Sequence, residues 1–264
     1  MKAKVYFTKE ITPEKVVEMY QALGVELPGK VAVKVHSGEK GNQNFLRPEF
    51  WRPMVEKVHG TIVECNTAYG DASGGVRDHT ESHRKLLEEH GWTKYFDVDL
   101  MDAEGPDVIW PIPNGKILKE NHLGKDIMNY DSMLVLAHFK GHPMGGYGGA
   151  LKQLAIGCAS RAGKALIHSG GKTDDRYETW DQHASKTAFP EAMADAASSV
   201  VEHFKGKIAF INVMKNLSVD CDCCAVAEDP CMKDIGILAS TDPVAIDQAC
   251  MDLVIQSDDP GKEH

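Results

Sequence analysis

Residues 132–157 read SMLVLAHFKGHPMGGYGGALKQLAIG, and this stretch decides the fold class. The apolar run at 132–139 is typical of a buried strand, because it is short and a glycine-rich turn follows it at once. Residues 149–158 then have the composition of a helix. A strand that leads through a turn into a helix is the repeating unit of α/β proteins with a parallel sheet.

The same succession of strands and helices continues in both directions along the chain. Further strands are predicted at 4–7, 30–36, 61–65, 94–98, 107–112, 115–119, 164–168, 207–214 and 234–240. Helices are predicted at 13–23, 48–58, 78–90, 186–204 and 243–255, the first and last with Thr12 and Asp242 as N-caps. We therefore expect an α/β fold with a mainly parallel sheet, helices on both faces and three layers. It is expected to form a single domain over 1–264, with a small lobe at 94–131.

Composition excludes several classes of function. The 264 residues include 39 acidic and 29 basic ones, a formal net charge of −10, and no basic run, so nucleic acid is not an expected partner. The longest apolar runs are far shorter than the ~18 residues of a membrane span. The first residues, MKAKVYFTKE, lack the apolar core of a secretion signal. These features predict a cytoplasmic protein without a membrane partner.

The richest chemical signal is a cluster of cysteines and aspartates near the C-terminus. It consists of Cys221, Cys223, Cys224 and Cys231, interleaved with Asp220 and Asp222. In a reducing compartment, clustered cysteines are typical of metal or redox sites. The spacing C-x-C-C-x6-C matches neither a ferredoxin nor a zinc ribbon. The alternatives are an iron–sulfur cluster, a single iron, zinc or nickel ion, thiol–disulfide chemistry, or no site.

Other reactive side chains directly follow predicted strands. His36 and Glu39 follow one strand, while His138, Lys140 and His142 follow another. Three further predicted strands are followed by Cys65, Asn66 and Tyr69, by His168, and by residues 220–224, respectively. Ligands of parallel sheets bind at the carboxyl ends of the strands, so these groups are expected to meet there. His36 and Glu39 are predicted proton-transfer groups, and His138, Lys140 and His142 are predicted to face the metal.

The glycine-rich turn is a candidate anion site. Gly145, Gly146, Gly148 and Gly149 let backbone amides approach a ligand at the start of a helix. A small anionic substrate, or the phosphate of a flavin, would suit this turn, whereas the alternative is a purely structural turn. The turn does not match the dinucleotide fingerprint, and residues 169–173 lack the first glycine of a P-loop. Arg77, together with residues 69–75, is a second candidate for holding an anion.

Five segments together resemble one known family. They are VAVKVHSGEKGNQNFLRP (31–48), VECNTAYGDASGGVRDHTESHRKLLEEHGW (63–92), AHFKGHPMGGYGGALKQLAIGCASRAGK (137–164), INVMKNLSVDCDC (211–223) and DIGILASTDPVAIDQACMDLV (234–254). In this order they resemble the domain of unknown function 362 family. The resemblance implies a prokaryotic, often anaerobic, α/β protein of iron–sulfur type. Relatives are expected to carry a ferredoxin insert after the segment matching 165–172, but residues 173–198 contain no cysteine.

The sequence leads to one principal hypothesis and two alternatives. The principal hypothesis is a redox protein or enzyme with a metal or iron–sulfur centre at the cysteine loop, an anionic ligand and an electron-transfer partner. The first alternative is a non-enzymatic module with a structural metal, which an enclosed four-ligand site would favour. The second is a metal-independent enzyme that acts on an anionic substrate at the glycine-rich turn.

Overall fold

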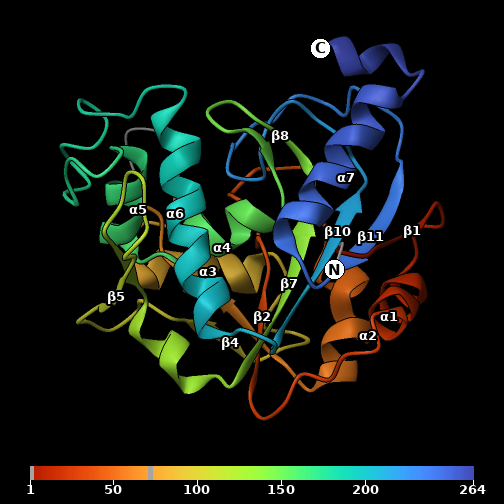
Figure 1. Cartoon of the computed structure of the whole chain (residues 1–264), viewed down its shortest axis with the longest axis horizontal. Helices are drawn as coiled ribbons and strands as arrows, with labels where there is room; N and C mark the ends of the chain where they lie inside the picture. The colour runs from red at the N-terminus through yellow and green to blue at the C-terminus, as the bar shows by residue number, and fades with distance from the viewer. Residues whose placement is uncertain (1–2, 71–73) are drawn as a thin grey trace.

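The computed structural model describes residues 3–70 and 74–264, and this part of the chain contains a seven-stranded sheet (Figure 1). The strands follow the order β1-β11-β10-β7-β2-β3-β4. Their bounds are β1 Val5–Thr8, β2 Val31–Lys34, β3 Thr61–Glu64, β4 Val98–Leu100, β7 Ser132–His138, β10 Ile208–Met214 and β11 Gly236–Ser240. The centre, from β10 across to β4, is parallel, and β11 joins β1 and β10 in antiparallel pairs.

Helices cover both faces of this sheet. Helices α1 (Pro13–Ala22), α2 (Pro48–Val58) and α3 (Thr80–Glu89) contribute to the core on one face. Helices α4 (Ala150–Cys158), α5 (Arg161–His168), α6 (Ala188–His203) and α7 (Pro243–Gln256) contribute to the core on the other. The expected three-layer α/β fold with a mainly parallel sheet is therefore confirmed. No helix in the described part of the chain has both the length and the apolar character that crossing a bilayer requires.

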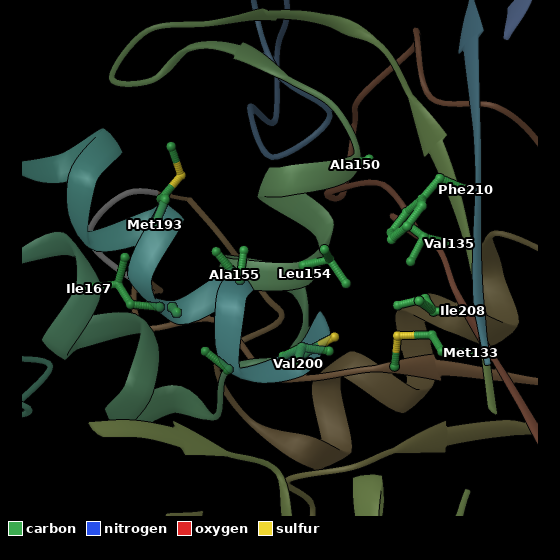
Figure 2. Packing of buried hydrophobic residues seen from close by; sticks show 14 of the residues in the cluster. Met133, Val135, Ala150, Leu154, Ala155, Ile167, Met193, Val200, Ile208 and Phe210 are labelled. Carbon is green, nitrogen blue, oxygen red and sulfur yellow. The ribbon is translucent and has the colours of Figure 1, made fainter. Parts of the chain in front are cut away.

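Strand alternation divides the apolar residues between these two cores. On β7, Met133 and Val135 face the α4–α7 side, whereas Leu134 and Leu136 face the α1–α3 side. Figure 2 shows the first core, where side chains of β7 and β10 lie against those of α4 and α6. Both faces of the central strands are buried, which explains why these strands read as continuous apolar runs in the sequence.

Three predicted strands are wrong. Residues 94–96 lie in a turn and a bend, and only residue 98 of the strand predicted at 94–98 belongs to a strand, β4. Residues 164–168 belong to helix α5, which begins where the Ser160 side chain accepts a hydrogen bond from the amide of Gly163. A short apolar run fits either structure, and the cap decides it. Residues 115–119 form bends, and the strand lies further on as β6 (Glu120–Leu123), paired with β5 (Val108–Pro111). Short 3₁₀ helices occupy Lys125–Asn129 and Pro260–Glu263.

The start of helix α4 is bound by a carboxylate of the protein itself. Asp247 of α7 is buried and accepts hydrogen bonds from the amides of Ala150 (2.8 Å) and Leu151 (2.9 Å). It also accepts one from the side-chain amide of Asn212 (2.7 Å). Gly149 permits this approach, since a Cβ there would lie 2.4 Å from an Asp247 oxygen. Burial raises the pKa of Asp247 to about 6 against the effect of these donors, so the side chain is ionised at neutral pH.

Asp247→Ala is expected to destabilise the fold by about 3 kcal/mol at pH 7, because it leaves buried donors without an acceptor. Urea unfolding followed by circular dichroism measures this loss. Asp252→Ala is the matched control on the same helix, since Asp252 is exposed and bonds only Gln248 among the described residues; its expected cost is below about 0.5 kcal/mol. Equal stabilities of the two variants would contradict the capping role of Asp247.

Candidate functional site

A pocket lies at the carboxyl ends of the parallel strands, where the side chains that follow β2, β3, β7 and β10 converge. We call it the inner pocket. Its lining residues are Lys34, His36, Glu64, Cys65, Thr67, Ala68, Tyr69, Arg77, His138, Lys140, His142, Gly148, Gly149, Lys152, Gln153, Ile156, Gly157, Lys164, His168 and Cys223. The strand ends that were expected to meet do so, apart from the contribution of His168, which comes from helix α5.

Two thiols and an imidazole lie together at one wall of this pocket, which His142 and Cys223 line. Donor atoms of His142, Cys221 and Cys223 all lie within 4.8 Å of one another, and Cys221 is fully buried. The backbone of the cysteine loop is fixed by a bond from the Cys224 amide to the Cys221 carbonyl (2.9 Å). The side chain of Asn42 adds a bond to the Cys224 carbonyl (2.8 Å). This His/Cys group could bind a metal ion.

The remaining predicted metal ligands are not members of this group. Cys224 is half-buried, and its sulfur lies 3.9 Å from an Asp220 oxygen. Cys231 lies further along the loop, where its thiol donates to the carbonyl of Leu217 (3.5 Å). Cys221 and Cys223 therefore lie close to His142, whereas the Cys231 thiol is hydrogen-bonded to a backbone carbonyl. That Cys224 and Cys231 bind metal stays a prediction.

Asp222 lies between the two grouped cysteines and points to β7 and the strand that follows it. It contacts His138 Nδ1 (2.9 Å) and Lys140 Nζ (2.7 Å), and all three side chains are buried. Burial opposes ionisation, but the nearby His138 and Lys140 outweigh it and hold the pKa of Asp222 well below its usual range. The other ring nitrogen of His138 faces the Lys215 carbonyl. Both ring nitrogens of His138 therefore face acceptor oxygens, which fixes the orientation of the ring.

His142 lies in the glycine-rich segment, which forms a hairpin of β8 (Lys140–His142) and β9 (Gly146–Gly148). Its Nδ1 accepts hydrogen bonds from the amides of Met144 (3.2 Å) and Gly145 (2.9 Å). Burial and the nearby Lys152 hold the pKa of His142 well below its usual range, so the ring is neutral. In this arrangement the proton is on Nε2. A metal ion at the ring would displace either the amides from Nδ1 or the proton from Nε2.

The predicted anion-binding glycines are divided between different surroundings. Gly148 and Gly149 line the inner pocket. Gly145 donates to His142, and Gly146 is exposed at a left-handed turn (φ +78°). The helix start behind them is already bound to Asp247. Anion binding by these four glycines stays a prediction. The positive charge that could bind an anion comes instead from side chains elsewhere in the pocket.

Buried cations surround the inner pocket, and some have carboxylate partners. Lys34 pairs with Glu64 (2.5 Å), and Arg77 pairs with Glu39 (3.1 Å). Burial by itself would raise the pKa of Glu64, but the Lys34 and Arg77 cations outweigh burial and lower it to about 2. These pairs neutralise themselves, so they add little net charge to the pocket.

Lys152 and Lys164 differ from these pairs because neither makes a salt bridge within the described part of the chain. Lys152 donates to the sulfur of Cys221 (3.0 Å), and Lys164 donates to the carbonyl of Ala159 (2.6 Å). Burial lowers the pKa of Lys164, which makes Lys152 the more firmly charged of the two. The inner pocket thus has an excess of positive charge, a setting that suits an anionic ligand.

The predicted proton-transfer pair is not joined by a hydrogen bond among the described residues. His36 lines the inner pocket, and burial together with Arg77 holds its pKa well below the usual range. Glu39 is buried behind the pocket wall, where it accepts from Arg77 (3.1 Å) and the Tyr69 hydroxyl (3.0 Å). Burial opposes ionisation of Glu39, but Arg77 and backbone amides lower its pKa. These contacts favour a role for Glu39 in positioning Arg77 and Tyr69.

Some pocket residues were missed by the sequence analysis. Lys34, Glu64, Gln153 and Lys164 were not singled out, although Lys34 interrupts the apolar strand VAVKV at its carboxyl end. That interruption is the available signal, because a lysine inside a buried strand needs a polar partner. Residues 69–75 were a predicted anion loop, and residues 71–73 of it lie outside the described residues, whereas Tyr69 and Arg77 line the pocket.

Comparison with solved structures finds similar folds. One is a structural-genomics protein from Thermotoga maritima, which is 12% identical in sequence and superposes with a TM-score of 0.51. The alignment covers 93% of this chain and 60% of that one. Another is the lactate racemase apoprotein from Thermoanaerobacterium thermosaccharolyticum, which is 10% identical and superposes with a TM-score of 0.51. The alignment covers 94% of this chain and 56% of the other. The chain thus spans 60% and 56% of the lengths of these proteins, and at such identities the likeness shows the fold alone.

Comparison with curated protein sequences gives no match. Residues 31–252 match the family described as domain of unknown function (DUF362), and the match includes the strands and loops that form the inner pocket. The chain belongs to this family.

Proposed function

We propose that this protein is a metal-dependent enzyme that acts on a small anionic substrate in the inner pocket. One observation carries the proposal: His142 and Cys223, two of the three grouped donors, line the same pocket as Lys152 and Lys164, which make no salt bridge among the described residues. A metal site that opens into a pocket with excess positive charge suits catalysis better than a purely structural role.

The donor set fits a single transition-metal ion. Thiolate and imidazole donors suit zinc, nickel or iron, and a set of three leaves a coordination position for a ligand. The contact with Cys223 and burial raise the pKa of the Cys221 thiol, and Lys152, whose ammonium lies 3.0 Å from the sulfur, opposes this and would help to stabilise a metal-bound thiolate. When bound, such an ion supplies Lewis-acid polarisation of a substrate oxygen. A four-thiolate iron–sulfur cluster would need further cysteines beyond the grouped pair, so we favour the single ion.

The substrate is proposed to carry a carboxylate or phosphate. Lys152 and Lys164 would bind this group, and neutral His36 and His168 would line the rest of the pocket. One fold neighbour is described as a lactate racemase apoprotein, and lactate is a small carboxylate, which supports this class of substrate. Redox chemistry with an electron-transfer partner stays a prediction.

The metal site predicts a specific loss in the double variant Cys221→Ser/Cys223→Ser. The chain purified anaerobically is expected to hold about one metal ion, and the variant is expected to lose most of it because thiolates are the stronger donors of the group. Elemental and sulfide analysis measures this. Cys231→Ser is the matched control, since it removes a sulfur from the same loop but outside the His/Cys group, and it should keep its metal.

Unchanged metal content in the double variant would overturn the assignment of these ligands. Iron with an equal amount of sulfide would replace the single ion by a cluster. Circular dichroism of each variant separates metal loss from unfolding.

The anion site predicts weaker binding in Lys152→Gln/Lys164→Gln. Titration calorimetry with inorganic phosphate and with lactate is expected to show a loss of affinity of roughly tenfold or more, since each removed charge contributes a charge-assisted hydrogen bond. Lys205→Gln is the control, because Lys205 is exposed and remote from the inner pocket. The affinity of the unmodified chain should fall as salt rises. Equal affinity of the Lys152→Gln/Lys164→Gln variant and the Lys205→Gln control would contradict anion binding by Lys152 and Lys164.

A further inference from the structure

A second groove opens beside the inner pocket, and we call it the outer groove. Ala68, Tyr69 and Cys223 line both, so the two spaces adjoin each other. Trp180 adds a second link. It lines the outer groove, and its ring meets the ring of His168, an inner-pocket residue, edge to face at 5.4 Å. A ligand held in the inner pocket therefore lies beside this groove.

The outer groove carries large apolar side chains that are exposed to solvent. Tyr177 is 77% exposed, Trp180 is 40% exposed and Val226 is 86% exposed. Tyr177 and Trp180 belong to the segment that leads from α5 to α6, whereas Val226 lies in the cysteine loop, between Cys224 and Cys231. Two segments far apart in the sequence thus place apolar surface at the same groove, and gathered apolar surface of this kind is typical of binding sites.

Arg176 adds a polar group to the groove. Its Nη2 donates to Asp78 (2.7 Å), and its guanidinium lies 5.0 Å from the centre of the Tyr177 ring. Its Nη1 is buried and has no hydrogen-bond partner within the described part of the chain. Buried donors without a partner are rare in folded proteins, so the described residues leave this donor of a groove-lining side chain unsatisfied.

We infer that the outer groove binds a flat ring that belongs to the same ligand as the anionic group in the inner pocket. This inference rests on the proposed function for the anionic end. Aromatic side chains and a guanidinium suit a planar ring that carries a hydrogen-bond acceptor. The ligand is therefore an organic anion with a flat ring. The anion is either the carboxylate of an aromatic acid or the phosphate of a flavin or purine mononucleotide.

Matched pairs of ligands test this inference by titration calorimetry on the full metal-loaded chain. The first pair is propionate and indole-3-propionate, and the second is inorganic phosphate and flavin mononucleotide, with adenosine monophosphate beside it. In one of the pairs, the compound with a ring is expected to bind roughly tenfold more tightly or better, because ring stacking adds to the anion contact. The pair that shows this gain identifies the anion.

The double variant Tyr177→Leu/Trp180→Leu is expected to abolish this gain and to leave the binding of propionate and phosphate unchanged. Both side chains are exposed, so the fold should tolerate their replacement. Met128→Ala is the control, since Met128 is also exposed but lies outside the outer groove. It should alter neither kind of binding.

The results separate this inference from the proposed function. Binding of the small anions without any gain from a ring would overturn the inference and leave the anion site in place. A gain that survives in the double variant would overturn it as well. Binding of the ring compounds alone would support the outer groove and count against the inner anion site. Failure of all the compounds to bind would overturn both.

Discussion

The buried carboxylate of Asp222 ties the cysteine loop to the sheet. It contacts His138 and Lys140, at the end of β7 and just beyond it, and its backbone carbonyl accepts a hydrogen bond from the amide of Glu39. A buried carboxylate is stable only when cations and donors surround it, so the loop has little freedom to leave this position. Cys221 and Cys223 flank Asp222, and the same constraint therefore holds their sulfurs near His142.

A second carboxylate changes how the glycine-rich segment can be used. A helix that begins after glycines normally attracts an anion. Here Asp247 already fills that place, and the segment before the helix folds into the β8–β9 hairpin that carries His142. The amides of this segment bind Asp247 and His142, while Lys152 and Lys164 keep their charges for the pocket. An external anion is thus directed to lysine side chains.

The fold was predictable because its signals are local. Apolar runs mark the central strands, and both Thr12 and Asp242 accept hydrogen bonds from the helices they cap, as expected. The error at residues 164–168 has the same origin, because the short apolar run at 165–167 does not distinguish a strand from a helix unless the Ser160 cap is recognised. Parallel strand ends then bring the reactive loops together, which is why the location of the pocket was predictable as well.

The detailed chemistry of the site was not predictable, because it depends on partners far away in the sequence. Glu39 looked free for proton transfer, yet Arg77 and Tyr69 bind it. Cys231 looked equivalent to Cys221, yet it turns to backbone. Spacing along the chain carries no information about such contacts, and only the tertiary structure shows which side chains are already neutralised.

Charge balance connects the two halves of the proposed site. Without a metal ion, Lys152 is the cation nearest to Cys221, and a thiolate there would use its charge. A divalent ion at Cys221 and Cys223 would balance both thiolates, which leaves the charge of Lys152 available to the substrate. Metal and anion binding would then reinforce each other, because each reduces the electrostatic cost of the other. The position of Lys152 between the thiol and the pocket gives this coupling its physical basis.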